Sequence, residues 1–147
     1  MTRYDYPGAP TRRDEQGGPP FFALIRAWAT GILVLVFTEY LQATVVYEHL
    51  ASEDRLETFT GRLLLIHLPN ALCIALAAWA AGRLHPEPYR DAPRRHLAAV
   101  ITVPVAAQAL NMALQWHGLS TEDLLMSNAV LVVGCMTGYA VDRLQED

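Results

Sequence analysis

The sequence has no lysine, only two cysteines and few charged residues, and these shortages exclude several classes of protein. Both cysteines, Cys73 and Cys135, lie in apolar stretches, so they do not form the disulfide framework of a small secreted domain. The formal charge of -4 is too small to indicate a nucleic-acid partner. There is no glycine-rich phosphate loop, no H-E-x-x-H pattern and no nucleophile elbow. We therefore expect neither an enzyme nor a bound cofactor.

Charged residues are also missing from long stretches of the chain. The composition is 52% hydrophobic and 18% charged, and the apolar residues gather in four blocks. A helix of about 20 apolar residues matches a hydrocarbon core of about 30 Å, whereas a soluble helix needs a charged face. We therefore predict an all-α fold, an integral membrane four-helix transmembrane bundle over 21–144. The predicted spans are 22–46, 63–82, 97–116 and 124–141. The alternative, a buried soluble four-helix core, leaves too little chain to cover four apolar helices.

The first 20 residues are polar and rich in proline and glycine. They have too little apolar surface to fold, and they do not resemble a cleavable signal peptide, so we predict a disordered cytoplasmic tail. Most arginines lie in this tail, in the connection at 83–96 and at the C-terminus, whereas the connection at 47–62 has only Arg55 and Arg62. Because arginine accumulates on the cytoplasmic side, we expect a multi-pass protein of the plasma membrane with both termini cytoplasmic. The lack of lysine and the many alanines are typical of a GC-rich genome, and we expect a bacterial membrane.

Each predicted span contains a strongly polar side chain, and these lie at nearly the same depth. At about 1.5 Å of rise per residue, these side chains lie about 6–8 Å from the span midpoints, toward the side of the 47–62 connection. The helices are expected to turn these groups inward, because an unpaired polar group facing lipid costs several kcal/mol. The candidate intramembrane polar site consists of these residues and their polar neighbours: Glu39, Gln42, His67, Asn70, Gln108, Asn111 and Asn128.

Glu39 is the central residue of this candidate site, because an ionisable residue within a span indicates a functional site by default. We predict His67 as its partner, since it lies at matching depth on the antiparallel neighbouring span. The two residues would bind or relay a proton, or coordinate a cationic substrate. Alternatively, the polar layer is interhelical hydrogen bonding worth about 1 kcal/mol per contact. We place the other four histidines at the two membrane surfaces, His49 and His117 at one and His85 and His96 at the other, so neither a metal site nor a haem is expected.

Other residues indicate how the spans begin, bend and pack. Gly134-x-x-x-Gly138 permits close helix contact, as does a stripe of small residues in the second span. Pro69 and Pro104 each remove a helical hydrogen bond and should bend their helices, and Pro93 argues against helix in the 83–96 connection. Ser120 followed by Asp123 is typical of a capping box, which would open the last span.

Three functions remain open. We favour a non-enzymatic structural or regulatory component of a membrane complex, with the lipid bilayer, other membrane proteins or a second copy of itself as partners. The second is a small proton- or ion-coupled transporter that uses the Glu39 and His67 pair. The third is a membrane enzyme or electron carrier at the outer leaflet, acting through His67 and Asn111.

Overall fold

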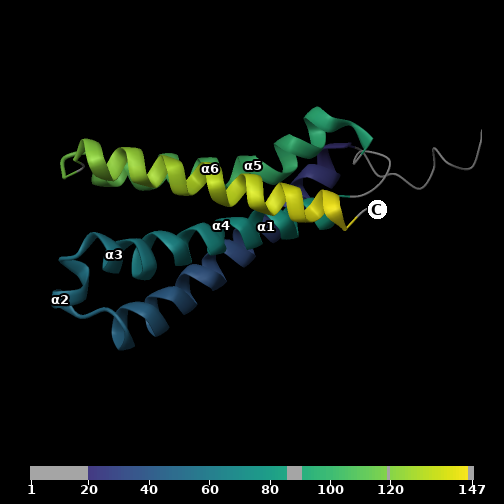
Figure 1. The fold of residues 1–147 in the computed structure, drawn as a ribbon. Coiled ribbons are helices and arrows are strands. Elements are labelled where there is room, and N and C mark those ends of the chain that lie inside the picture. The colour runs from purple at the N-terminus through teal and green to yellow at the C-terminus, as the bar shows by residue number, and fades with distance from the viewer. Residues whose placement is uncertain (1–19, 86–90, 119, 146–147) are drawn as a thin grey trace, which may run out of the picture.

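All regular elements among the described residues, 20–85, 91–118 and 120–145 of a computed structural model, are helical (Figure 1). The predicted disordered tail falls, except for its last residue, outside this part of the chain. In order, the elements are α1 (Pro20–Gln42), the π-helix η1 (Ala43–Tyr47), α2 (Glu53–Leu56), α3 (Phe59–Arg62), the π-helix η2 (Leu63–His67), α4 (Leu68–Arg83), α5 (Pro93–Gln115) and α6 (Thr121–Leu144).

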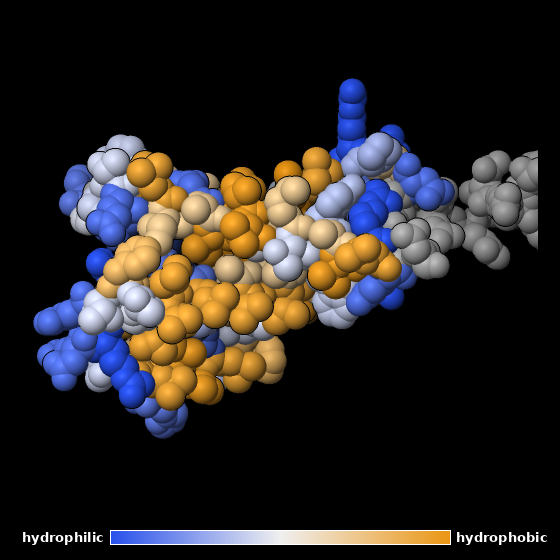
Figure 2. All heavy atoms as spheres, viewed as in Figure 1, coloured by the Kyte–Doolittle hydropathy of each residue, from blue (hydrophilic) through white to orange (hydrophobic). Residues whose placement is uncertain are grey.

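Four helical stretches of the described residues are long and apolar enough to cross a membrane, which confirms the predicted number of spans. They are Phe21–Tyr47, Phe59–Arg83, Pro93–Gln115 and Thr121–Leu144. At most 22% of the most apolar window of each stretch is buried inside the protein, so the other apolar side chains face outward. On the face shown in Figure 2, a hydrophobic band separates two hydrophilic ends. Such a surface is stable in lipid and not in water, as in a multi-pass membrane protein.

The second and third spans begin earlier than predicted, and each has a local cause. Thr58 caps the second span, because its Oγ1 accepts a hydrogen bond from the amide of Gly61 at 3.0 Å. Pro93 begins α5 instead of interrupting the connection before it. A proline in the first turn of a helix is favourable, since the amide hydrogen that it lacks would have no helical partner there.

The predicted capping box at the start of α6 is confirmed. Ser120 Oγ accepts from the amide of Asp123 at 3.1 Å, and the Asp123 carboxylate accepts from the amide of Ser120 at 3.3 Å. The π-helix η2 ends two residues before Pro69, and the amide of Leu68 donates to the carbonyl of Leu63, five residues back. A wider turn of this kind changes the hydrogen-bond register at the point where proline has no amide hydrogen.

The central helix α4 contacts α1, α5 and α6. Glycines of α6 permit the closest of these approaches. A β-carbon at Gly138 would lie 2.5 Å from the carbonyl oxygen of Ala75 and 2.7 Å from the β-carbon of Ala78. A β-carbon at Gly134 would lie 2.9 Å from the carbonyl oxygen of Ala71. The two helices therefore pack backbone against backbone, as the small residues in the sequence predict.

The bundle is closed at one end and divided at the other. We call the end where α1 begins and α6 ends the terminal end, and the opposite end, near α2 and α3, the loop end. The pair α1 and α4 separates from the pair α5 and α6 toward the loop end, and the pairs converge at the terminal end (Figure 1). Alanines pack without exposure in the terminal half, where Ala27, Ala81 and Ala99 form one cluster. This arrangement leaves room for cavities in the loop half.

Candidate functional site

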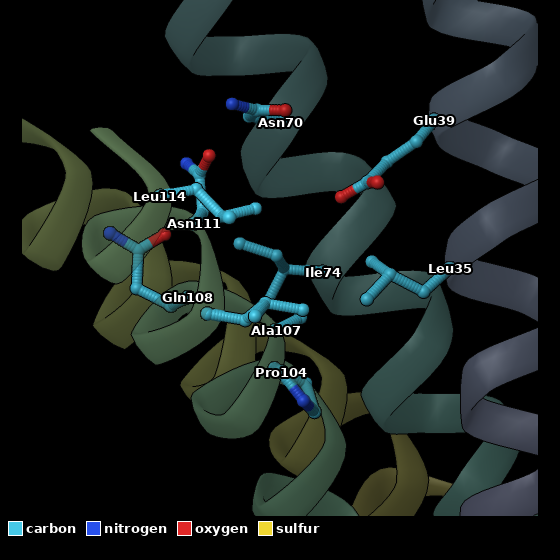
Figure 3. A pocket seen from close by; sticks show the side chains of 10 residues that line it. Leu35, Glu39, Asn70, Ile74, Pro104, Ala107, Gln108, Asn111 and Leu114 are labelled. Carbon is cyan, nitrogen blue, oxygen red and sulfur yellow. The ribbon is translucent and has the colours of Figure 1, made fainter.

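A cavity of about 360 Å³, here called the Glu39 cavity, lies between α1, α4 and α5 in the loop half of the bundle (Figure 3). The Glu39 side chain extends from α1 toward α4, and amide side chains of α4 and α5 lie around the same space. Leu114, one residue before the end of α5, is also part of the wall, so the cavity extends toward the loop end. The lining residues are Leu35, Glu39, Asn70, Ile74, Pro104, Ala107, Gln108, Leu110, Asn111 and Leu114.

A second cavity of about 220 Å³, here called the His67 cavity, lies between α4, α5 and α6. Its wall includes His67 and, from the start of α6, Asp123 and Ser127. The two cavities share four lining residues, which are Asn70, Ile74, Gln108 and Asn111. Three amide side chains therefore border both spaces, and they separate Glu39 from His67.

The predicted Glu39 and His67 pair is not formed in this arrangement. Glu39 lines the Glu39 cavity but not the His67 cavity, His67 lines the His67 cavity but not the Glu39 cavity, and among the described residues no ion pair joins them. Glu39 instead shares its cavity with Asn70, Gln108 and Asn111. Similar depth along the helices does not decide which polar groups meet, because the rotation of each helix about its axis also determines which groups face one another.

The other two candidate residues lie away from the cavities just described. Gln42 is buried between α1 and α4, where its Oε1 accepts from the Cys73 thiol at 3.4 Å. Asn128 is exposed, and its Nδ2 donates to the carbonyl of Leu124 in its own helix at 2.7 Å. This local bond satisfies one of the two amide hydrogens, and Asn128 faces outward from the bundle and does not line either cavity.

The groups that line the Glu39 cavity can bind a cation or hold a proton. A carboxylate accepts hydrogen bonds and attracts positive charge, while the surrounding amides both donate and accept. Among the residues described, no group of three or more His, Cys, Asp or Glu side chains could hold a metal ion. One carboxylate with neutral amides instead suits a singly charged group, such as a proton, a monovalent cation or an ammonium.

Sequence reasoning missed a buried contact between two ionisable side chains at the terminal end. His96 Nε2 lies 2.9 Å from Asp142 Oδ2, and neither side chain has any exposure. The rings of His85 and Tyr139 lie on His96, each with its centroid 5.8 Å away. The sequence predicts that His85 and His96 lie near one membrane surface, but it does not predict that both are buried within the protein.

A signal for this contact is present in the sequence. Asp142 follows Gly134 and Gly138 at intervals of four, so it continues the helix face that packs on α4. The facing residue of α4 is Gly82, where a β-carbon would lie 2.8 Å from Asp142 Oδ2. The stripe of small residues on α4 therefore ends at Gly82, which leaves room for the Asp142 carboxylate of α6.

Further polar contacts tie the spans together at the same end. The Arg26 guanidinium of α1 donates to the carbonyl of Leu84, just after α4, at 2.9 and 3.2 Å. The Trp79 indole of α4 donates to Gln145 Oε1, just after α6, at 3.0 Å. Arg26 thus satisfies a carbonyl at a helix C-terminus, where a positive charge is favourable.

Comparison with known proteins adds nothing to this description, because no protein-family model, no curated protein and no solved structure matches the chain. The function is therefore inferred from the geometry of the chain itself.

Proposed function

We propose that this chain is a small proton- or ion-coupled membrane transporter that binds its cation at Glu39. The observation that carries this proposal is the position of the Glu39 carboxylate in a polar cavity at membrane depth, together with Asn70, Gln108 and Asn111. A carboxylate within a span is costly unless charge or water compensates it. In the transporter proposed here, the side-chain amides of Asn70, Gln108 and Asn111 are the partners of Glu39, in place of His67.

The surroundings of Glu39 favour cycles of binding and release over a permanent structural contact. Among the described residues, Glu39 has no ion-pair partner, and its side chain is exposed. A bound cation, or a proton, would neutralise the charge and would leave when water reaches it. The terminal half is packed with alanines and sealed by the His96 and Asp142 contact, so the conformation described here would load from the loop end.

The distribution of arginines indicates which end of the bundle would face the cytoplasm. The terminal end has several arginines, including Arg26, Arg83 and Arg143, and we place this end on the cytoplasmic side of the plasma membrane. The loop end, with Glu48 and Glu53, would then face the outside. A cation would approach an acidic loop end before reaching Glu39.

Flux through the purified protein tests the proposal. Proteoliposomes that contain a pH-sensitive dye, or in parallel a sodium- or potassium-sensitive dye, would be given a membrane potential, negative inside, with protons alone or with the matching cation added outside. We expect flux with the unmodified protein and none with Glu39→Gln. The matched control is Glu48→Gln, an exposed carboxylate at the loop end, which should keep its flux. Equal flux through Glu39→Gln and the unmodified protein would refute the proposal.

A component of a membrane complex is the second candidate. Its specific support is that the separated helix pairs leave Glu39 and Asn111 exposed at membrane depth, where a helix of a partner, or of a second copy, would cover them. Crosslinking in native membranes would recover such a partner. Recovery of neither a partner nor an oligomer would count against this function.

A further inference from the structure

Glu39 lines two cavities with different chemistry. The first is the polar Glu39 cavity. The second is a groove of about 390 Å³ between α1 and α5, here called the α1–α5 groove. Leu35, Glu39, Ala107 and Leu110 belong to both walls. The remaining lining residues of the groove are Trp28, Ile32, Val36, Thr102, Val103 and Ala106. Glu39 therefore lies where the polar Glu39 cavity adjoins the apolar α1–α5 groove.

The α1–α5 groove faces the surface that meets lipid. Ile32 and Val36 are more than half exposed, and Ala106 on the opposite wall is exposed as well. Within the part of the chain that the structure describes, Glu39 is the only ionisable residue that lines either space. An alkyl chain can therefore pass from the bilayer into the groove without meeting another charge before it reaches Glu39.

We propose that the ligand is an ammonium-headed amphiphile drawn from the bilayer, an inference that rests on the function proposed above. Its ammonium group binds Glu39 inside the Glu39 cavity, and its alkyl chain lies in the α1–α5 groove. The amide oxygens of Asn70, Gln108 and Asn111 are available to accept the remaining ammonium hydrogen bonds. Each space has the volume of a typical small-molecule site, roughly 300–1,000 Å³.

Charge complementarity commits the site to this head group. Among the described residues, neither wall contains an arginine or a histidine, and the chain has no lysine. A phosphate or sulfate would thus meet the Glu39 carboxylate with no positive side chain to compensate it, and like charges repel most strongly where the dielectric constant is low. An ammonium group without an adjacent phosphate fits this lining, and a phospholipid head group does not.

The head group, and not the chain, should decide binding. An alkyl chain that moves from lipid into the groove exchanges one apolar environment for another, so it gains little free energy. The ammonium, in contrast, gains an ion pair at a depth where charge is poorly solvated. Chain length should therefore affect affinity weakly, and head-group charge should affect it strongly.

Trp28 provides a reporter for the chain, because it lines the α1–α5 groove and its indole is held by a hydrogen bond to the carbonyl of Ala98 at 3.4 Å. The other two tryptophans would be replaced by Trp79→Phe and Trp116→Phe. The full-length protein in nanodiscs of neutral lipid would then be titrated with an alkylammonium whose chain carries bromine, which quenches tryptophan fluorescence on contact. The comparison probe is the alkyl sulfate with the same brominated chain.

We expect saturable quenching of Trp28 by the alkylammonium, loss of the saturable part in Glu39→Gln, and only gradual, unsaturable quenching by the alkyl sulfate. Ala106→Phe, which fills the groove, should also abolish saturation. Ala109→Phe is the matched control, since Ala109 is an exposed alanine of α5 that belongs to neither wall. Equal quenching by the two probes, or saturation that survives Glu39→Gln, would overturn the inference.

The outcomes for binding and for transport are separable. Glu39-dependent flux of protons or small cations without saturable quenching would refute the amphiphile and leave the transporter. Glu39-dependent quenching without any flux would refute the transporter and leave the amphiphile site.

Discussion

Two ionisable sites within the spans differ in what surrounds them. Glu39 borders cavities and is exposed, whereas His96 and Asp142 are in contact and fully enclosed. An enclosed pair is costly to take out of water and even more costly to break, because the remaining partner is left without its counter-charge. We therefore assign ligand binding to the open site and closure of the terminal end to the enclosed one.

Asp142→Asn should destabilise the protein by on the order of 3 kcal/mol, because it leaves His96 beside a neutral group in a buried position. The free energy of unfolding, measured in detergent micelles with heat or with a denaturant, gives this loss of stability. His96→Gln should cost a similar amount, and the double variant less than the sum, since the two side chains share one contact. Gln145→Ala is the control, because it removes only the exposed hydrogen bond to Trp79, worth about 1 kcal/mol. Strictly additive losses would show that the pair is not a unit.

At the scale of the elements, α4 determines how the bundle packs. Its small residues face the glycines of α6 on one side, and Ala81 lies 3.4 Å from a β-carbon built at Gly31 of α1. In a bilayer, contact between helices gains little from the hydrophobic effect, so a close fit between backbones is the main attraction. The contact between α4 and α6 is therefore sensitive to a single methyl group.

Gly138→Ala should destabilise the protein by roughly 1–3 kcal/mol, since its β-carbon would meet the backbone of Ala75 at 2.5 Å and force α6 away from α4. The same unfolding measurement applies. Gly118→Ala is the matched control, because the nearest atom to its β-carbon would be the carbonyl oxygen of Gln115, at 3.8 Å. If both substitutions had the same small effect, α4 and α6 would not be in backbone contact.

The sequence predicts the elements better than their rotation. Span number, the Ser120 cap and the glycine contact follow from length, spacing and residue size, which act locally. The sequence predicts no helix at Pro93, whereas α5 begins there, because proline can either end or begin a helix. Asn128 and His96 show the larger difficulty. A polar side chain at a given depth can face lipid, a cavity or a neighbouring helix, and the choice depends on the packing of helices that are distant in sequence.

At the scale of the whole molecule, the four spans are fastened at the terminal end and separated at the loop end. The fastened end holds the His96 and Asp142 contact and the alanine cluster, while the separated end holds the Glu39 cavity. A bundle with one end closed and a carboxylate in the wall of the open half is suited to receiving a ligand from one side at a time. The central claim is thus that Glu39 faces an aqueous cavity that opens at the loop end.

The accessibility of position 39 to a membrane-impermeant thiol reagent tests this claim most directly. Glu39→Cys would be compared with Phe37→Cys, because Phe37 is 60% exposed at similar depth and lines neither the Glu39 cavity nor the α1–α5 groove. Both native cysteines are buried and should contribute little background. With reagent added outside intact cells, we predict rapid modification at position 39 and none at position 37. Equal modification at the two positions, or none at position 39, would contradict the account.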